Sequence, residues 1–125
     1  MSYTAPIQDM LFVMQELAGL DEVTKLPGFE EATPDVVEQI LRENARFCSE
    51  VLAPLNATGD QEGSTLSDGH VTTPKGFKAA YRQFIEAGWS ALESPAEFGG
   101  QGLPKLVGTP ALEMWNSANL SFSLC

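Results

Sequence analysis

Apolar residues recur along the chain at steps of three and four, the spacing that places side chains on one face of an α-helix. The first such pattern lies between Pro6 and Gly19, and its apolar positions are Ile7, Met10, Leu11, Met14 and Leu17. Pro6 suits the first turn of a helix and Gly19 suits a stop. We expect the stripe to pack on the same protein, although methionine also suits a surface that binds a partner.

A longer helical pattern follows Thr33-Pro34-Asp35, where threonine can cap the first turn and proline fits its first position. Its apolar side comprises Val37, Ile40, Leu41, Cys48, Val51, Leu52 and Leu55. Because proline lacks a backbone donor, Pro54 predicts that this helix ends near Ala53. The preceding residues 21–32 are predicted to form a solvated acidic connector.

Residues 56–71 are rich in glycine, serine, aspartate and threonine, which predicts a loop. Within it, Ser67-Asp68-Gly69 predicts a turn or a very short hairpin. His70 is the only histidine and has no cysteine or nucleophile motif beside it. The pattern favours an exposed loop histidine over a metal ligand or a catalytic group.

Thr73-Pro74 repeats the cap-and-proline signal and predicts a third helix, which ends before Gly88. Its apolar positions are Phe77, Ala80, Tyr81, Phe84 and Ile85, and Trp89 is expected to fold back onto its end. Three cations, Lys75, Lys78 and Arg82, make this helix the least acidic one. A solvated face explains them most simply, with an acidic partner or a cofactor phosphate as the alternatives.

The stretch from Ser94 to Gly102 predicts a connector of fixed shape. Pro95 disfavours helix at Ser94, and Gly99-Gly100 and Gly102 allow backbone angles that other residues avoid. A phosphate-binding loop would need a following Gly-Lys-Ser/Thr, and a dinucleotide fold would need Gly-x-Gly-x-x-Gly after a strand. Neither motif is present, so a structural turn is favoured.

Beyond the connector, residues 103–108 predict one helical turn, and Thr109-Pro110 predicts the start or a kink of a final helix. Apolar residues then fall on more than one side of that helix, at Leu112, Trp115, Ala118, Leu120, Phe122 and Leu124. Such a helix is buried on more than one side. The pattern reaches Cys125 without a stop signal, so either the protein ends with an exposed apolar helix, or the final helix is incomplete and the chain is the front part of a longer one.

Composition limits the classes of protein that need considering. The 125 residues suit one domain, and the helical patterns predict that it is all-α, with three or four helices. Seven basic and seventeen acidic residues give a net charge of −10, which argues against binding to nucleic acid or to anionic membranes. No apolar run approaches the roughly 20 residues of a membrane span, and no leader is evident, so a cytoplasmic protein is expected. Cys48 and Cys125 form no metal or disulfide motif.

Three motifs, taken in order, resemble the acyl-CoA dehydrogenase family. FIEAGW followed by PAEFGGQGLP resembles the link between early helices of that family, and VLAPLNATGDQEG resembles an upstream helix end and loop. The segment YTAPIQDMLFVMQELAGLDEV resembles an addition found in a bacterial subset of members. The resemblance implies an N-terminal extension with one amphipathic helix over residues 1–32 and a partial N-terminal helical domain over residues 33–125. It also implies that this all-α domain is an up-and-down, bundle-like set of helices whose final helix is incomplete.

The resemblance also implies a function for the intact protein. Family members oxidise an acyl-CoA thioester to the 2,3-enoyl-CoA, pass a hydride to FAD, and release electrons to an electron-transfer flavoprotein. They are usually homo-oligomers. The catalytic glutamate and the main flavin contacts belong to later domains, so no glutamate here, including Glu93 and Glu97, is assigned as the base. This chain alone is expected to bind no FAD and to be inactive.

Matching the spacing from Gly99-Gly100 places Phe122, Ser123 and Leu124 on the stretch that approaches the acyl chain. Glu113 matches a glutamate early in the same region. Packing against later domains is the alternative role for all four residues. A second class of function also stays open, in which the chain is a non-enzymatic acidic helical module that binds a partner.

Overall fold

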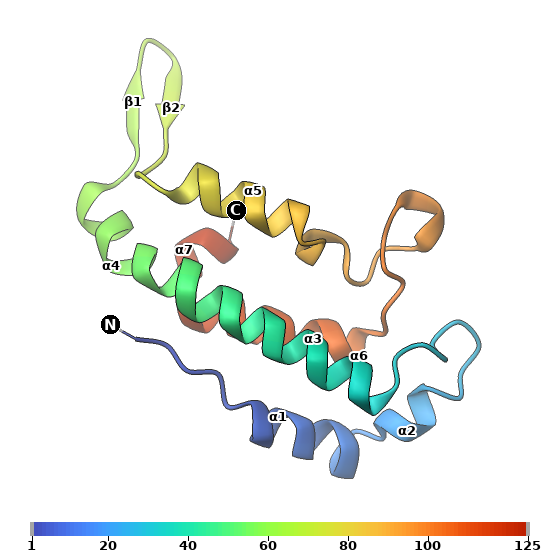
Figure 1. Ribbon diagram of the computed structural model, residues 1–125. Helices are drawn as coiled ribbons and strands as arrows, with labels where there is room; N and C mark the ends of the chain where they lie inside the picture. Colours follow the sequence, from blue (N-terminus) through green and yellow to red (C-terminus); the bar gives the residue numbers. More distant parts are fainter. Residues whose placement is uncertain (1, 125) are drawn as a thin grey trace.

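The computed structural model describes residues 2–124 and consists mainly of helices, which confirms the all-α class (Figure 1). The α-helices are α1 (Ile7–Phe12), α2 (Leu20–Val23), α3 (Pro34–Phe47), α4 (Ala53–Glu62), α5 (Phe77–Glu86), α6 (Lys105–Ala118) and α7 (Leu120–Ser123). Two wider π-helical turns are η1 (Val13–Leu17) and η2 (Cys48–Leu52), and two 3-10 turns are η3 (Trp89–Ala91) and η4 (Ala96–Phe98). Strands β1 (Thr65–Ser67) and β2 (His70–Thr72) form a hairpin.

The central layer consists of α3 and α6, which contact each other, with α1 on the other side of α3 and α5 above them (Figure 1). Side chains from all four helices fill one core between these layers. Its fully buried members include Val37, Leu41, Cys48, Leu52, Val107 and Met114. Of the first predicted stripe, Met10, Leu11 and Met14 are buried, so α1 packs on the same protein, whereas Leu17 is exposed.

The prediction that Pro54 ends the second helix is wrong, because helix continues through η2 and α4 to Glu62. Proline inside a helix lacks the donor for the carbonyl four residues earlier and crowds that carbonyl. Here the turn before Pro54 is widened, and the backbone N–H of Ala53 donates to Cys48 O, five residues earlier. The widened turn accommodates the proline ring without ending the helix.

The starts of α5 and α6 also differ from the sequence prediction. α5 begins at Phe77, after Gly76 in a left-handed conformation, and not directly at Thr73-Pro74. Near the other end of the chain, α6 begins at Lys105 and runs through Pro110 as one helix. The break comes later, at Asn119, whose extended backbone separates α6 from α7. Thr33 does precede α3 with extended geometry and Pro34 in the first turn, but its side chain makes no capping hydrogen bond.

The predicted short hairpin is confirmed, and it projects from the helices (Figure 1). Ser67 pairs with His70 across Asp68-Gly69, and both turn residues have positive φ, as a tight two-residue hairpin requires. His70 is therefore an exposed strand residue. None of the helices within residues 2–124 is long and apolar enough to cross a bilayer.

Candidate functional site

The glycine connector holds one edge of the molecule in a defined shape. Backbone amides within it donate inward, from Gly100 to Pro95 O, from Gln101 to Ala91 O and from Gly102 to Ser94 O. A Cβ on Gly100 would collide with the backbone carbonyl of Ser94, which explains why glycine is needed there. Because these amides are already used, the connector is not a phosphate cradle, in agreement with the structural interpretation of its sequence.

A cleft of about 420 Å³ opens between α5, the connector and the α6–α7 pair. We call it the α5–α6 cleft. Its wall is mainly apolar, with polar side chains at its edges. The lining residues are Tyr81, Phe84, Trp89, Ser90, Leu92, Glu93, Ser94, Gly108, Leu112, Trp115, Phe122 and Ser123.

Aromatic side chains form the floor of this cleft. The ring of Phe84 meets Trp115 edge-on with 5.0 Å between centroids, and meets Phe122 edge-on at 5.6 Å. Edge-to-face pairs of this kind are more favourable than their buried area alone implies. Trp115 is held further by its indole N–H, which donates to Asn44 Oδ1 at 2.6 Å. The floor is therefore rigid, and α5 is attached to α6 and α7 chiefly through it.

Two polar side chains of the cleft lining, those of Ser123 and Glu93, differ in their surroundings. The hydroxyl oxygen of Ser123 is buried and has no hydrogen-bond partner among residues 2–124. Glu93 lies against Gly108, where a Cβ would collide with its carboxylate, and it forms an ion pair with Lys105 at 3.2 Å. A buried hydroxyl without a partner is costly, so Ser123 is a position in the cleft wall where a polar group is retained at some expense of stability.

The three residues predicted to approach an acyl chain do not share one cavity. Phe122 and Ser123 line the α5–α6 cleft. Leu124 is 76% exposed and lines a wider groove of about 830 Å³ beside α4 and the base of the hairpin. We call this the α4–α7 groove. Successive residues on a short helix point in different directions, which explains the separation.

Glu113 lies away from both spaces. It is exposed on α6 and lines a small depression against α1, together with Met10 and Met14. Its charge helps to raise the pKa of Tyr3, after the larger effect of desolvation. This arrangement places Glu113 next to the N-terminal segment and not next to Phe122.

The described part of the chain brings together no cluster of side chains suited to acid–base, nucleophilic or metal chemistry. A search of residues 2–124 finds no cluster of three potential metal ligands. Burial raises the pKa of the Cys48 thiol to about 12, so this cysteine is protonated at neutral pH and is no nucleophile. Cys125 lies outside the described residues.

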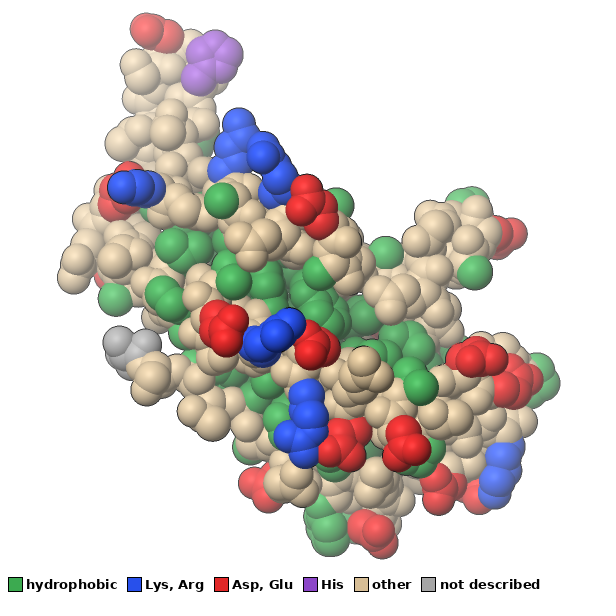
Figure 2. Space-filling model, viewed as in Figure 1, with side chains coloured by type: hydrophobic (Ala, Val, Ile, Leu, Met, Phe, Trp, Pro, Cys, Tyr) green, Lys and Arg blue, Asp and Glu red, His purple; other side chains and the backbone are tan. Residues whose placement is uncertain are grey.

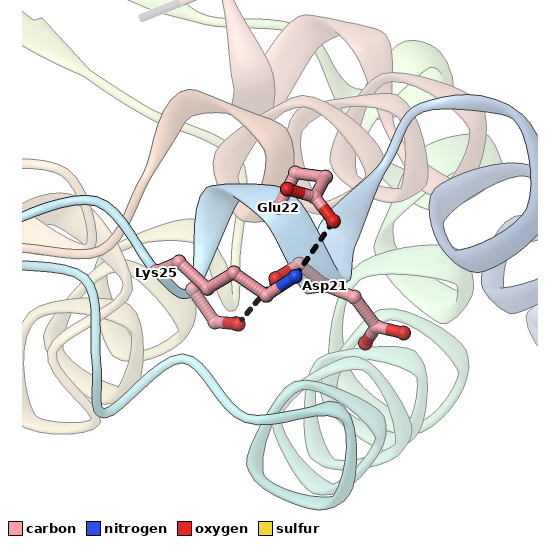
Figure 3. Close-up of polar contacts among 4 residues, drawn as sticks. Asp21, Glu22 and Lys25 are labelled. Atoms are coloured by element: carbon pink, nitrogen blue, oxygen red, sulfur yellow. Dashed lines mark hydrogen bonds and ion pairs between the residues drawn. The ribbon is translucent and has the colours of Figure 1, made fainter.

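The most compact group of exposed polar contacts is on α2 (Figure 3). Lys25 Nζ donates to Glu22 Oε1 at 2.7 Å, and Thr24 Oγ1 donates to the backbone oxygen of Asp21. The hydrogen bond with Glu22 raises the pKa of Lys25. Both side chains are mostly exposed, and this pair is a surface feature that closes one helical turn.

Sequence patterns did not identify the residues that give the cleft its shape. The sequence predicts Trp89 at the end of one helix and Trp115 in the apolar stripe of another. Both line the same cleft, because the path of the connector brings them together. Asn44 and Asn119 are buried, at 0% and 1% exposure, and bind across the core. The signal available in the sequence was an asparagine among apolar residues at helical spacing. A buried amide requires hydrogen-bond partners, so such an asparagine indicates a polar contact inside the core.

Comparison with known proteins adds the remaining evidence. No family model matches the chain. It is 46% identical, over all 125 residues, to 3-methylmercaptopropionyl-CoA dehydrogenase of Ruegeria pomeroyi, and the match covers 21% of that protein, at its N-terminal end. The chain thus spans about a fifth of the length of this relative. Its resemblance to the acyl-CoA dehydrogenase family is therefore confirmed: from end to end, the chain is similar to the N-terminal part of a member of that family.

Proposed function

We propose that the chain is the N-terminal part of an FAD-dependent acyl-CoA dehydrogenase that oxidises an acyl-CoA thioester to the 2,3-enoyl-CoA. The observation that supports this most strongly is 46% identity along the whole chain to a dehydrogenase of acyl-CoA type. The name of the relative makes 3-methylmercaptopropionyl-CoA the first substrate to test. The parent enzyme would be a cytoplasmic homo-oligomer that passes electrons to an electron-transfer flavoprotein.

Within that enzyme, the chain would supply one wall of the acyl pocket. The α5–α6 cleft supports this role, because it combines an aromatic floor with a lining that is more apolar than polar, as an acyl chain requires. Phe122 and Ser123 would contact the acyl chain from this side, and Leu124 would contact it if the chain instead follows the α4–α7 groove. The wall would orient the substrate and exclude water, and it would take no part in proton transfer.

The described residues do not fit FAD. The amides of the glycine connector are used internally, and neither the α5–α6 cleft nor the α4–α7 groove is lined by a Lys or Arg that could hold a pyrophosphate. A net charge of −10 also disfavours a polyanionic cofactor. The flavin and the catalytic base would therefore be held by other parts of the intact enzyme.

The proposal can be tested with the intact gene product and the 125-residue chain purified in parallel. We expect flavin absorbance and acyl-CoA oxidation, measured with an artificial electron acceptor, only in the intact protein. A colourless, inactive, monomeric gene product of native length would contradict the proposal and support the acidic interaction module.

The position of the acyl chain can be tested separately in the intact enzyme. Ser123→Phe would fill the α5–α6 cleft, whereas Leu124→Trp would fill the α4–α7 groove. We expect one of the two to raise KM for longer acyl-CoA substrates at least about tenfold more than for short ones, which corresponds to about 1.4 kcal/mol of lost binding. The variant that shifts the chain-length profile identifies the space used. If neither shifts it, α7 is not part of the pocket.

A further inference from the structure

Three cations on and beside α5 differ from all other basic residues of the chain. Four of the seven lysine and arginine side chains form ion pairs, namely Lys25, Arg42, Arg46 and Lys105. Within the described range 2–124, the other three, Lys75, Lys78 and Arg82, form none. Glu86 is four residues after Arg82 on the same helix, yet no ion pair joins them. In a chain with seventeen acidic residues, this local excess of unpaired positive charge needs an explanation.

These cations share a face with exposed apolar side chains. Lys78 and Arg82 are four residues apart, and Tyr81 and Ile85 fall on the same side of α5, because residues three and four apart are neighbours on a helix. Tyr81 is 56% exposed and Ile85 is 44% exposed. The opposite side of the helix faces the core through Ala80, which is 1% exposed. Figure 2 shows Lys and Arg side chains gathered over α5, beside the projecting hairpin.

We propose that this α5 face, made of Lys75, Lys78, Tyr81, Arg82 and Ile85, is a docking surface for an acidic segment of another protein. Tyrosine and arginine are the residues most enriched among the side chains that dominate protein interfaces. Cations beside exposed apolar side chains select a partner surface that carries both negative charge and apolar groups. This proposal does not depend on the enzymatic function.

Charge complementarity separates this partner from a second copy of the chain, from nucleic acid and from an anionic bilayer. Closed dimers pair the same patch on both copies, so a second copy would place the three cations against themselves. Nucleic acid and anionic bilayers extend beyond the patch and would meet the carboxylates that give the chain its charge of −10. A small phosphate ligand would not be enclosed, since no cation of this face lines the α5–α6 cleft or the α4–α7 groove.

The test uses the intact protein in its native cells, with photoreactive p-benzoylphenylalanine in place of Tyr81. After irradiation, the cross-linked peptides are sequenced by mass spectrometry. The same experiment is repeated with Lys78→Glu/Arg82→Glu and with a matched control, Arg42→Glu/Arg46→Glu, which makes the same change in charge on another exposed helix face. Thermal melting monitored by circular dichroism verifies that both variants fold.

We expect a cross-link to a peptide of another protein that carries several carboxylates. Its yield should fall about tenfold in the α5 variant and stay within about twofold in the control, because only the α5 cations would face the partner. The same peptide, synthesised with a fluorescent label, should bind the purified intact protein about tenfold more weakly at 300 mM than at 20 mM salt.

Other results would overturn the proposal. A cross-link within the same chain would show that α5 faces another domain of the intact protein, and a cross-link to a second copy would show a self-interface. A partner peptide without carboxylates, an equal loss in both double variants, or no cross-link at all would likewise reject an acidic docking partner.

Discussion

Replacing Asn119 should destabilise the fold more than its small size suggests. This residue is 1% exposed and lies where α6 ends and α7 begins. Its Nδ2 donates to Leu52 O at 3.1 Å, and its Oδ1 accepts from the backbone N–H of Phe122 at 3.1 Å and from Ser121 Oγ at 2.8 Å. One side chain therefore ties the widened turn η2 to both C-terminal helices.

The magnitude follows from the groups that Asn119→Ala would leave without partners. Loss of a capping side chain costs about 1 kcal/mol. The Leu52 carbonyl keeps its partner within α4, so losing its second, buried hydrogen bond costs about 0.5–1.5 kcal/mol. The free energy of unfolding should therefore fall by about 1.5–2.5 kcal/mol, a sizeable fraction of the roughly 5–15 kcal/mol that stabilises an ordinary domain.

Urea unfolding of the 125-residue chain, followed by circular dichroism, measures this change. Asn119→Ser should be milder by about 1 kcal/mol, because serine still caps α7 but does not reach Leu52 O. Asn56→Ala is the matched control, since Asn56 is exposed on α4. A loss below about 1 kcal/mol for Asn119→Ala, or one equal to that of the control, would refute the argument.

Three further predictions concern the buried Cys48 and the closely packed Gly100. In a Cys125→Ser background, Cys48 should react with iodoacetamide at pH 8 at least about a hundredfold more slowly in the folded chain than in urea, because burial raises its pKa from 9.0 to about 12. The same shift means that its contribution to stability is complete below pH 9 and declines as pH rises toward 12, which urea unfolding across that range would detect. Gly100→Ala should lower the free energy of unfolding by about 3 kcal/mol, because the added Cβ would collide with the Ser94 carbonyl. Gly102→Ala is the control and should cost about 1 kcal/mol, because its Cβ would meet open space and only the positive φ is unfavourable. Equal losses in the two variants would contradict the collision.

Helix positions could be predicted from sequence because a helix buried on one face carries apolar residues at every third or fourth position. The stripe from Val37 to Leu52 lies on a real helix, and the stop at Gly88 is real, since φ there is +79°. The failures were at prolines. The sequence predicts that Pro54 ends a helix, yet it lies inside one, because the widened turn before it outweighs the local penalty. Thr109-Pro110 predicts the start or a kink of the final helix, and Pro110 lies inside α6, which begins earlier, at Lys105.

The candidate site could be predicted only in part. The motif spacing led to Phe122 and Ser123, which do line a cleft, but the direction of Leu124 depends on the break at Asn119. No local pattern encodes that break, because it is stabilised by a hydrogen bond to Leu52 from a distant part of the chain. The convergence of Trp89 with Trp115 is equally non-local.

The two buried asparagines also affect the order in which the protein folds during synthesis. Asn44 binds Ala111 O and Asn119 binds Leu52 O, and each contact spans 67 residues. At roughly 5–20 residues per second, a ribosome needs about 3–13 s to make the second partner after the first. Throughout that interval α3 has emerged, but the part of its surface that contacts α6 is uncovered and the amide of Asn44 has no Ala111 carbonyl to bind. Chaperone access at this stage would protect the long helix until α6 arrives and closes the core.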